Sequence, residues 1–167
     1  MKTITKLFIP MVAFVVMLTN LSTMAQHPQP ERPEAKEDAR TIIHRTKVVI
    51  EEAQRAVARG HVYNGDLAKA ISHQHFAIKL YNQGFYGRAI NHTIRARQLA
   101  FVAIRDNKEA IKAEWNWDPK ELNYVKALPP ESQLEREVAT AKIDADLKDE
   151  KASTNTYGDL DLNIEVR

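Results

Sequence analysis

The longest uninterrupted helical pattern in the chain lies in residues 84–104. Apolar or small residues cover most of its circumference, and they are Tyr86, Ala89, Ile90, Thr93, Ile94, Ala96, Leu99, Ala100, Phe101, Ala103 and Ile104. A helix this apolar must be covered by neighbours on several sides. The helix has one polar stripe, whose positions recur at steps of three and four. It consists of Arg88, Asn91 or His92, Arg95, Gln98, Val102 and Arg105. This stripe is where water or a partner can reach the helix.

Two further helices are predicted before this segment. In residues 35–59, apolar positions recur at three and four, and Gly60 is placed to end the helix. Asp66 is a suitable N-cap for a helix over residues 67–83, and Gly84 then ends it in the left-handed conformation that glycine tolerates. Because so few residues separate the second and third helices, we expect them to pack antiparallel as a hairpin.

The pattern weakens after Ile104, although the third helix is predicted to continue to about residue 113. Asp118, Pro119 and Glu121 then supply the cap, the first position and the third position of a short helix. Another helix, with a thin and alanine-rich apolar stripe, is predicted over residues 131–151.

These elements predict an all-α fold, an antiparallel helical bundle of three main helices with a looser helical C-terminal extension. The expected segments are a signal peptide (1–25), a mobile, proline-rich leader (26–35), the bundle (36–113), the extension (114–151) and a mobile tail (152–167). In the tail, residues 160–167 alternate apolar and polar side chains, which is the period of a strand. The tail is therefore either disordered or loosely docked, or it adds as a strand to a partner.

Residues 1–25 predict export. Lys2 and Lys6 form a basic start, residues 7–18 form an apolar run of secretory length, and small residues precede a cleavage point after Ala25. A membrane-spanning helix needs about 20 apolar residues, so we expect cleavage rather than a stable anchor. The expected location is the periplasm or the exterior of the cell.

The charge balance narrows the range of partners. The chain has 24 basic and 22 acidic residues, and removal of Lys2 and Lys6 with the signal peptide leaves 22 of each. The resulting net charge of zero does not support a nucleic-acid partner. Residues 85–113 carry six basic and two acidic residues, whereas residues 118–167 carry seven basic and twelve acidic ones. These opposite signs can dock within the chain or steer a protein partner or a second copy.

Histidines are the candidate metal ligands, because the chain contains no cysteine. His75 and His92 lie at similar distances on either side of Gly84, so an antiparallel hairpin places them at about the same height. If the two face each other, they can hold a metal ion with His44 or a carboxylate as a third ligand. The alternative is that one of the two histidines lies on the surface and the other bonds a neighbouring group.

No phosphate loop, nucleophile elbow or zinc-protease motif is present, and no catalytic residue or cofactor is predicted.

The hairpin resembles that of HEPN-type helical bundles in its order of small, aromatic and histidine residues, which are Gly84, Tyr86, Ala89, His92, Ala96 and Ala100. Its first half is similar to a single tetratricopeptide unit. The HEPN resemblance implies a bundle scaffold. The nuclease members of that group carry Arg, four to six residues, then His in a later helix, and this chain has no histidine after His92. The resemblance therefore does not extend to RNA cleavage.

Two functions are consistent with these features. The first is an exported, non-enzymatic protein that binds another macromolecule, or has a structural role, with a contact surface made of Arg88, Asn91, His92, Arg95 and Arg105. Its partner would be an acidic group, or the stripe would hold the protein's own acidic C-terminal region. The second is a small-ligand or metal-binding bundle that uses His44, His75 and His92.

Overall fold

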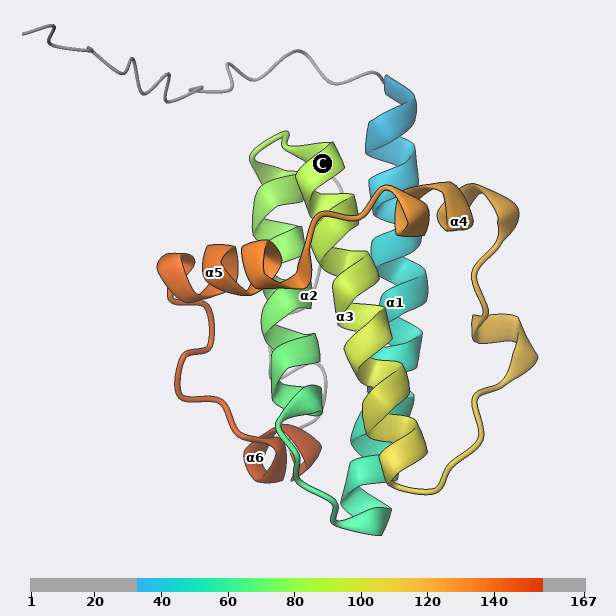
Figure 1. The fold of residues 1–167 in the computed structure, drawn as a ribbon, viewed down its shortest axis with the longest axis vertical. Coiled ribbons are helices and arrows are strands. Elements are labelled where there is room, and N and C mark those ends of the chain that lie inside the picture. Colours follow the sequence, from blue (N-terminus) through green and yellow to red (C-terminus); the bar gives the residue numbers. More distant parts are fainter. Residues whose placement is uncertain (1–32, 155–167) are drawn as a thin grey trace, which may run out of the picture.

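The computed structural model describes residues 33–154, and these form six α-helices and one 3-10 helix (Figure 1). The elements in order are α1 (Pro33–Gly60), α2 (Asp66–Asn82), α3 (Tyr86–Asp106), η1 (Ala113–Trp115), α4 (Pro119–Lys126), α5 (Glu131–Ala141) and α6 (Asp149–Thr154). The predicted all-α bundle of three main helices is confirmed. The predicted signal peptide, most of the leader, and the strand-like tail lie outside the described residues.

The core lies where α1, α2 and α3 meet, and α3 contacts both other long helices (Figure 1). Small side chains at these contacts have almost no exposed surface, and they are Ala39, Ala53, Ala70, Ala77, Ala89, Ala96, Ala100 and Ala103. Such side chains let helix backbones approach closely, and buried isoleucines such as Ile50, Ile71 and Ile94 fill the remaining space. The dense apolar pattern of residues 84–104 therefore does mark the central helix.

Gly84 joins α2 to α3 as predicted. Its φ of 85° lies in the left-handed region, which costs glycine little. The backbone N–H of Gly84 donates to Tyr81 O at 3.0 Å, and that of Phe85 donates to Leu80 O at 2.9 Å. This pair of bonds is the Schellman arrangement, which satisfies the last carbonyls of α2 and turns the chain back on itself.

Two boundaries of the long helices differ from prediction. α1 begins at Pro33 rather than near Ala35, because proline at the start of a helix loses no hydrogen bond and already has a helical φ. α3 ends at Asp106 rather than near residue 113. Lys108 takes a left-handed φ of 62°, and the side chain of Asn107 accepts from Val62 N at 2.9 Å, which ties the end of α3 to the α1–α2 connection.

The C-terminal extension is partly as predicted. Asp118 and Glu121 form the expected capping box at the start of α4, with Pro119 in the first turn. The single helix predicted over residues 131–151 is wrong, because the chain leaves α5 at Lys142, where φ is 51°, and begins α6 only at Asp149. α5 crosses the middle of α2 and α3, whereas α6 lies beside the start of α2 (Figure 1). The contacts that α5 and α6 each make with the long helices thus outweigh the continuation of residues 131–151 as a single helix.

The predicted N-cap of α2 is also wrong. Asp66 is the first residue of α2, and the preceding Gly65 has no side chain with which to cap it. The carboxylate of Asp149, at the start of α6, takes this role. It accepts from Gly65 N at 2.7 Å and from Ala68 N at 2.8 Å. A negative charge is favourable at the N-terminus of a helix, so a distant residue both caps α2 and anchors α6.

Candidate functional site

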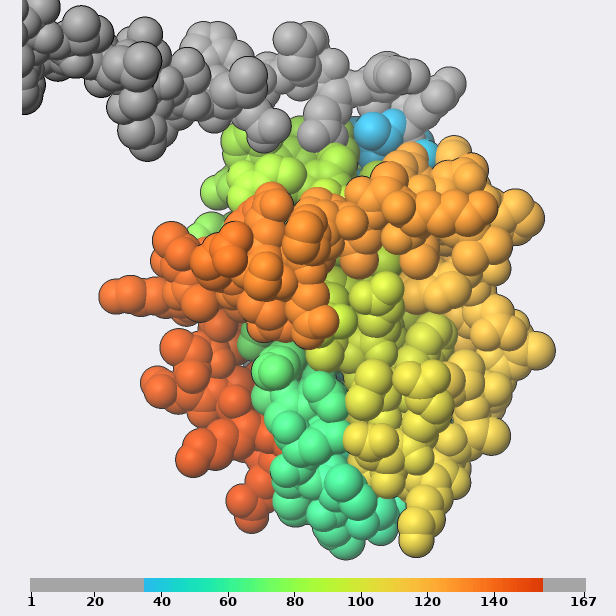
Figure 2. Space-filling view, in the orientation of Figure 1, coloured from blue at the N-terminus to red at the C-terminus, as the bar shows by residue number. Residues whose placement is uncertain are grey.

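The predicted polar stripe of α3 is paired with α5. Arg88 donates to Glu137 at 2.8 Å, and Arg95 bonds Glu131 and lies 3.5 Å from Glu135. Figure 2 shows α5 and the segment that leads into it, in orange, lying over the middle of this face. The glutamates of α5 therefore dock on two arginines of α3.

The remaining members of the stripe have different surroundings. Asn91 is half-buried and Arg105 is exposed. His92 has no exposed surface, so it does not belong to a solvent-facing stripe. Only part of the predicted surface is thus available to a partner while α5 is docked.

The partner of His92 is His73 of α2, and their Nδ1 atoms lie 3.0 Å apart. Both imidazoles are fully buried, their rings stack with centroids 5.2 Å apart, and Phe76 packs edge-on against His92. The prediction had paired His92 with His75 on the basis of height along the hairpin. Successive residues turn by about 100° in a helix, so His75 points about 200° away from His73, and it faces Asp144 instead.

The structure does not bring the three predicted metal ligands together. His44 is exposed on α1, His75 bonds Asp144, and His92 bonds His73. Within residues 33–154, no group of three or more His, Cys, Asp or Glu side chains is placed to hold a metal ion.

The hydrogen-bond roles of the histidine pair follow from its carboxylate neighbours. Nε2 of His92 lies 3.2 Å from Glu137, and a carboxylate only accepts, so this nitrogen carries the proton. Nδ1 of neutral His92 is therefore an acceptor, and Nδ1 of His73 donates to it. Neutral His73 is left with a lone pair at Nε2, which faces Glu135 Oε1 at 3.4 Å. Two acceptors thus face each other.

The charge states support this assignment. Burial, together with the neighbouring His92, lowers the pKa of His73 to about 4, although Glu135 opposes the shift. Burial also lowers the pKa of His92, against the opposing effect of Glu137. Burial raises the pKa of Glu137, but hydrogen bonds from Arg88, Gln133 and His92 outweigh it and bring that pKa to about 2. At neutral pH the pair is therefore uncharged, with an ionised carboxylate at its Glu137 end.

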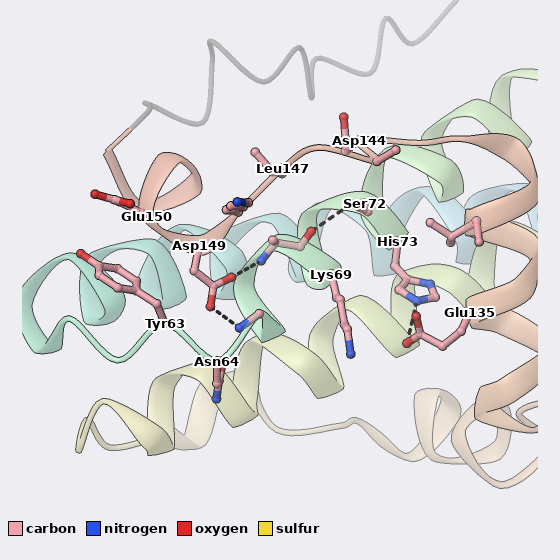
Figure 3. Close-up of a pocket in the computed structure, with 16 residues that line it drawn as sticks. Tyr63, Asn64, Lys69, Ser72, His73, Glu135, Asp144, Leu147, Asp149 and Glu150 are labelled. Atoms are coloured by element: carbon pink, nitrogen blue, oxygen red, sulfur yellow. Dashed lines mark hydrogen bonds and ion pairs between the residues drawn. The ribbon is translucent and has the colours of Figure 1, made fainter.

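His73 and Glu135 also line a cavity of about 560 Å³ between α2, α5 and α6 (Figure 3). Its lining combines exposed side chains, among them Tyr63, Lys69, Lys148 and Glu150, with the buried side chains of His73, Val138 and Asp149. Within the described residues, His73 Nε2 and Glu135 Oε1 are buried atoms without a hydrogen-bond partner. Buried polar atoms normally have partners, so this pair is the most unusual polar feature of the cavity wall.

Sequence reasoning missed His73 as a site residue. The signal was the spacing of Ala70, His73, Ala77 and Leu80, which places His73 on a buried side of α2. The sequence favoured His75 instead, because His75 lies at about the same height along the hairpin as His92.

A second buried polar cluster holds α4 against the bundle. Arg97, with no exposed surface, makes two bonds to Glu121 at 2.9 and 3.1 Å and also donates to Thr46. Trp117 packs on its guanidinium at 4.6 Å from the ring centre. Arg45 also lies 2.9 Å from Glu121. Every polar group in this cluster is matched, so it is a structural anchor and not a ligand site.

Comparisons of the chain with models of protein families, with curated proteins and with solved structures gave no match. The likeness of the hairpin to HEPN-type bundles, or to a tetratricopeptide unit, stays a prediction. Within residues 33–154, no helix is long and apolar enough to cross a membrane.

Proposed function

We propose that this protein is an exported helical bundle that binds a small polar ligand in the cavity between α2, α5 and α6. The single observation that supports this function best is the pair of buried acceptors, His73 Nε2 and Glu135 Oε1, on the cavity wall. A volume of about 560 Å³ falls in the range of small-molecule sites, which combine apolar walls with a few convergent polar groups. Ala68, Val138 and Leu147 supply such apolar walls.

Export is part of this proposal and rests on the pattern of residues 1–25, which lie outside the described residues. The basic start, the short apolar run and the small residues before position 26 support cleavage by a signal peptidase. Mass spectrometry of the protein purified from the native cell envelope should find Gln26 as the first residue, and an intact Met1 would contradict export by this route.

Binding of another macromolecule through the arginine stripe is the second candidate. It is supported by the ion pairs that Arg88 and Arg95 form with carboxylates of α5, since an acidic partner would meet the same two arginines. An acidic partner, however, would have to displace α5 to reach them. In the cavity only the contact between His73 Nε2 and Glu135 Oε1 has to open, which is a smaller change than displacing α5, so we rank ligand binding first.

Ligand binding can be tested by NMR with ¹⁵N-labelled protein and a collection of cationic, neutral and anionic fragments. Binders should shift the amide signals of residues 65–73, 135–139 and 144–150, which surround the cavity. Ala139 is an exposed residue of the cavity wall, so Ala139→Trp should fill the cavity and abolish these shifts. Ala58→Trp, at an exposed position of α1, is the matched control and should leave them intact. The absence of any such shifts, or their persistence in Ala139→Trp, would refute the function.

A further inference from the structure

The chemistry of the cavity wall restricts the class of ligand. His73 Nε2 and Glu135 Oε1 lie 3.4 Å apart, and both accept hydrogen bonds. Since His92 and Glu137 fix the direction of the His73 bond to His92, His73 cannot turn its proton towards Glu135 without breaking that chain. The missing complement is therefore a group that donates more than one hydrogen bond.

The charges around the cavity also favour a ligand that donates hydrogen bonds. Four carboxylates (Glu135, Asp144, Asp149 and Glu150) and two ammonium groups (Lys69 and Lys148) line it. Asp144 bonds His75, and Asp149 bonds two backbone N–H groups, so their charges are partly compensated. Glu135 is shared with Arg95, but at 3.5 Å this is a long contact. The lining thus carries a net negative charge, and a cation is favoured over an anion.

We propose that the ligand carries a protonated primary or secondary amine, and that its N–H groups donate to His73 Nε2 and Glu135 Oε1. This inference rests on the proposed function and names its ligand class. Both acceptor atoms are buried, so the half-buried Glu135 side chain must turn slightly to admit the nitrogen, which then has normal hydrogen-bond lengths of about 2.9 Å to both. Bonds from a charged donor to a carboxylate are stronger than those between neutral groups, and the apolar part of the molecule then lies along Ala68, Val138 and Leu147.

Other ligand classes fit less well. A divalent metal ion would need further protein ligands, and the described residues supply no group of three at this place. A carboxylate or phosphate would place its oxygens against those of Glu135. A quaternary ammonium carries the charge but has no N–H to donate, and a neutral alcohol donates one bond without charge.

A series of ligands of similar shape separates these classes. Titrations followed by NMR would use benzylamine, benzyl alcohol, benzyltrimethylammonium and benzoate with the full protein. Benzylamine should bind at least about ten-fold more tightly than the alcohol and the quaternary amine, and benzoate should bind weakest. Glu135→Gln should weaken benzylamine by about ten-fold or more, since it removes the charge at nearly constant shape. Glu114→Gln, an exposed carboxylate in η1, should change it by less than about two-fold.

The outcomes distinguish this inference from the function beneath it. If fragments of any kind shift the cavity signals but benzyl alcohol or benzoate binds as well as benzylamine, the cavity is a ligand site and the amine assignment is wrong. Equal affinity of benzylamine for the Glu135→Gln variant would mean that only water meets these two acceptors, and it would also overturn the assignment. If no fragment shifts the cavity signals, the proposed function itself fails.

Discussion

At the scale of the residue, two buried polar groups have opposite surroundings. Arg97 has its guanidinium matched by Glu121, by Thr46 and by the backbone oxygen of Ile42. His73 is as deeply buried, but one of its nitrogens faces a second acceptor. Burial lowers the pKa of Arg97, while Glu121 opposes the shift and holds the charge in place. A matched group stabilises the fold, and an unmatched one indicates a place for something else to bind.

The pairing of Arg97 and Glu121 can be tested by substitution. Arg97→Met should lower the free energy of unfolding by about 3–5 kcal/mol, because it leaves the buried Glu121 carboxylate without its main partner. The double variant Arg97→Met, Glu121→Leu should recover a large part of this loss, as measured by urea denaturation. Arg105→Met, at an exposed position of the same helix, should change stability by less than about 0.5 kcal/mol. Strictly additive losses in the double variant would contradict a coupled pair.

At the scale of the element, several helix ends are set by residues far away in the sequence. Asp149 caps α2 from the start of α6, and Asn107 joins the end of α3 to Val62 in the connection before α2. The contact of Asp149 holds α6 to the bundle, and it also shapes the cavity, because α6 and the segment before it form one of its walls (Figure 3).

Removal of the Asp149 carboxylate should therefore affect both helices. Asp149→Ala is expected to cost about 1–2 kcal/mol of stability, since two N–H groups at the start of α2 lose their acceptor. Hydrogen exchange at residues 65–68 and over α6 should become faster. The neighbouring exposed residue supplies the control, and Glu150→Ala should leave exchange at residues 65–68 unchanged. Wild-type exchange rates in Asp149→Ala would show that α6 is held by other contacts.

At the scale of the whole molecule, titratable groups with shifted pKa values gather on one side of the bundle. The His73–His92 pair sits between α2 and α3, with Glu135 and Glu137 of α5 and Arg88 and Arg95 of α3 around it. Protonation of the buried pair in the fold is unfavourable, because it places charge where burial penalises it. In the unfolded chain, a histidine protonates at its ordinary pKa of about 6.5.

The free energy of unfolding should therefore fall as pH decreases from about 6.5 to about 4, because the unfolded state binds more protons over this range. The contribution of His73 is on the order of 3 kcal/mol. Below about pH 4.5, protonation of Glu137 should reduce stability further, since its pKa in the fold is about 2.

Urea denaturation at pH 7.5, 5 and 4 measures how steeply the free energy of unfolding changes with pH. His73→Gln should flatten this slope between pH 6.5 and 4, whereas His44→Gln, at an exposed position, should not. An equal slope in both variants would rule out His73 as its origin.

The sequence by itself determined the elements whose causes are local. The spacing of apolar residues predicted the three long helices, Gly84 predicted the turn between α2 and α3, and Asp118 with Glu121 predicted the capping box of α4. Each of these depends on residues a few positions apart, which touch one another whatever the rest of the chain does. The charge pattern left open whether the acidic C-terminal region docks within the chain or steers a partner, and the structure places glutamates of α5 against Arg88 and Arg95.

Only the tertiary structure decided which distant side chains meet. It paired His92 with His73 instead of His75, gave the cap of α2 to Asp149 instead of Asp66, buried Arg97 against Glu121, and divided the last predicted helix into α5 and α6. These outcomes depend on the rotation of each helix about its axis and on the path of the chain between helices. A difference of one residue turns a side chain by about 100°, so the sequence placed histidines on the hairpin but did not determine which of them meet or which cavity they line.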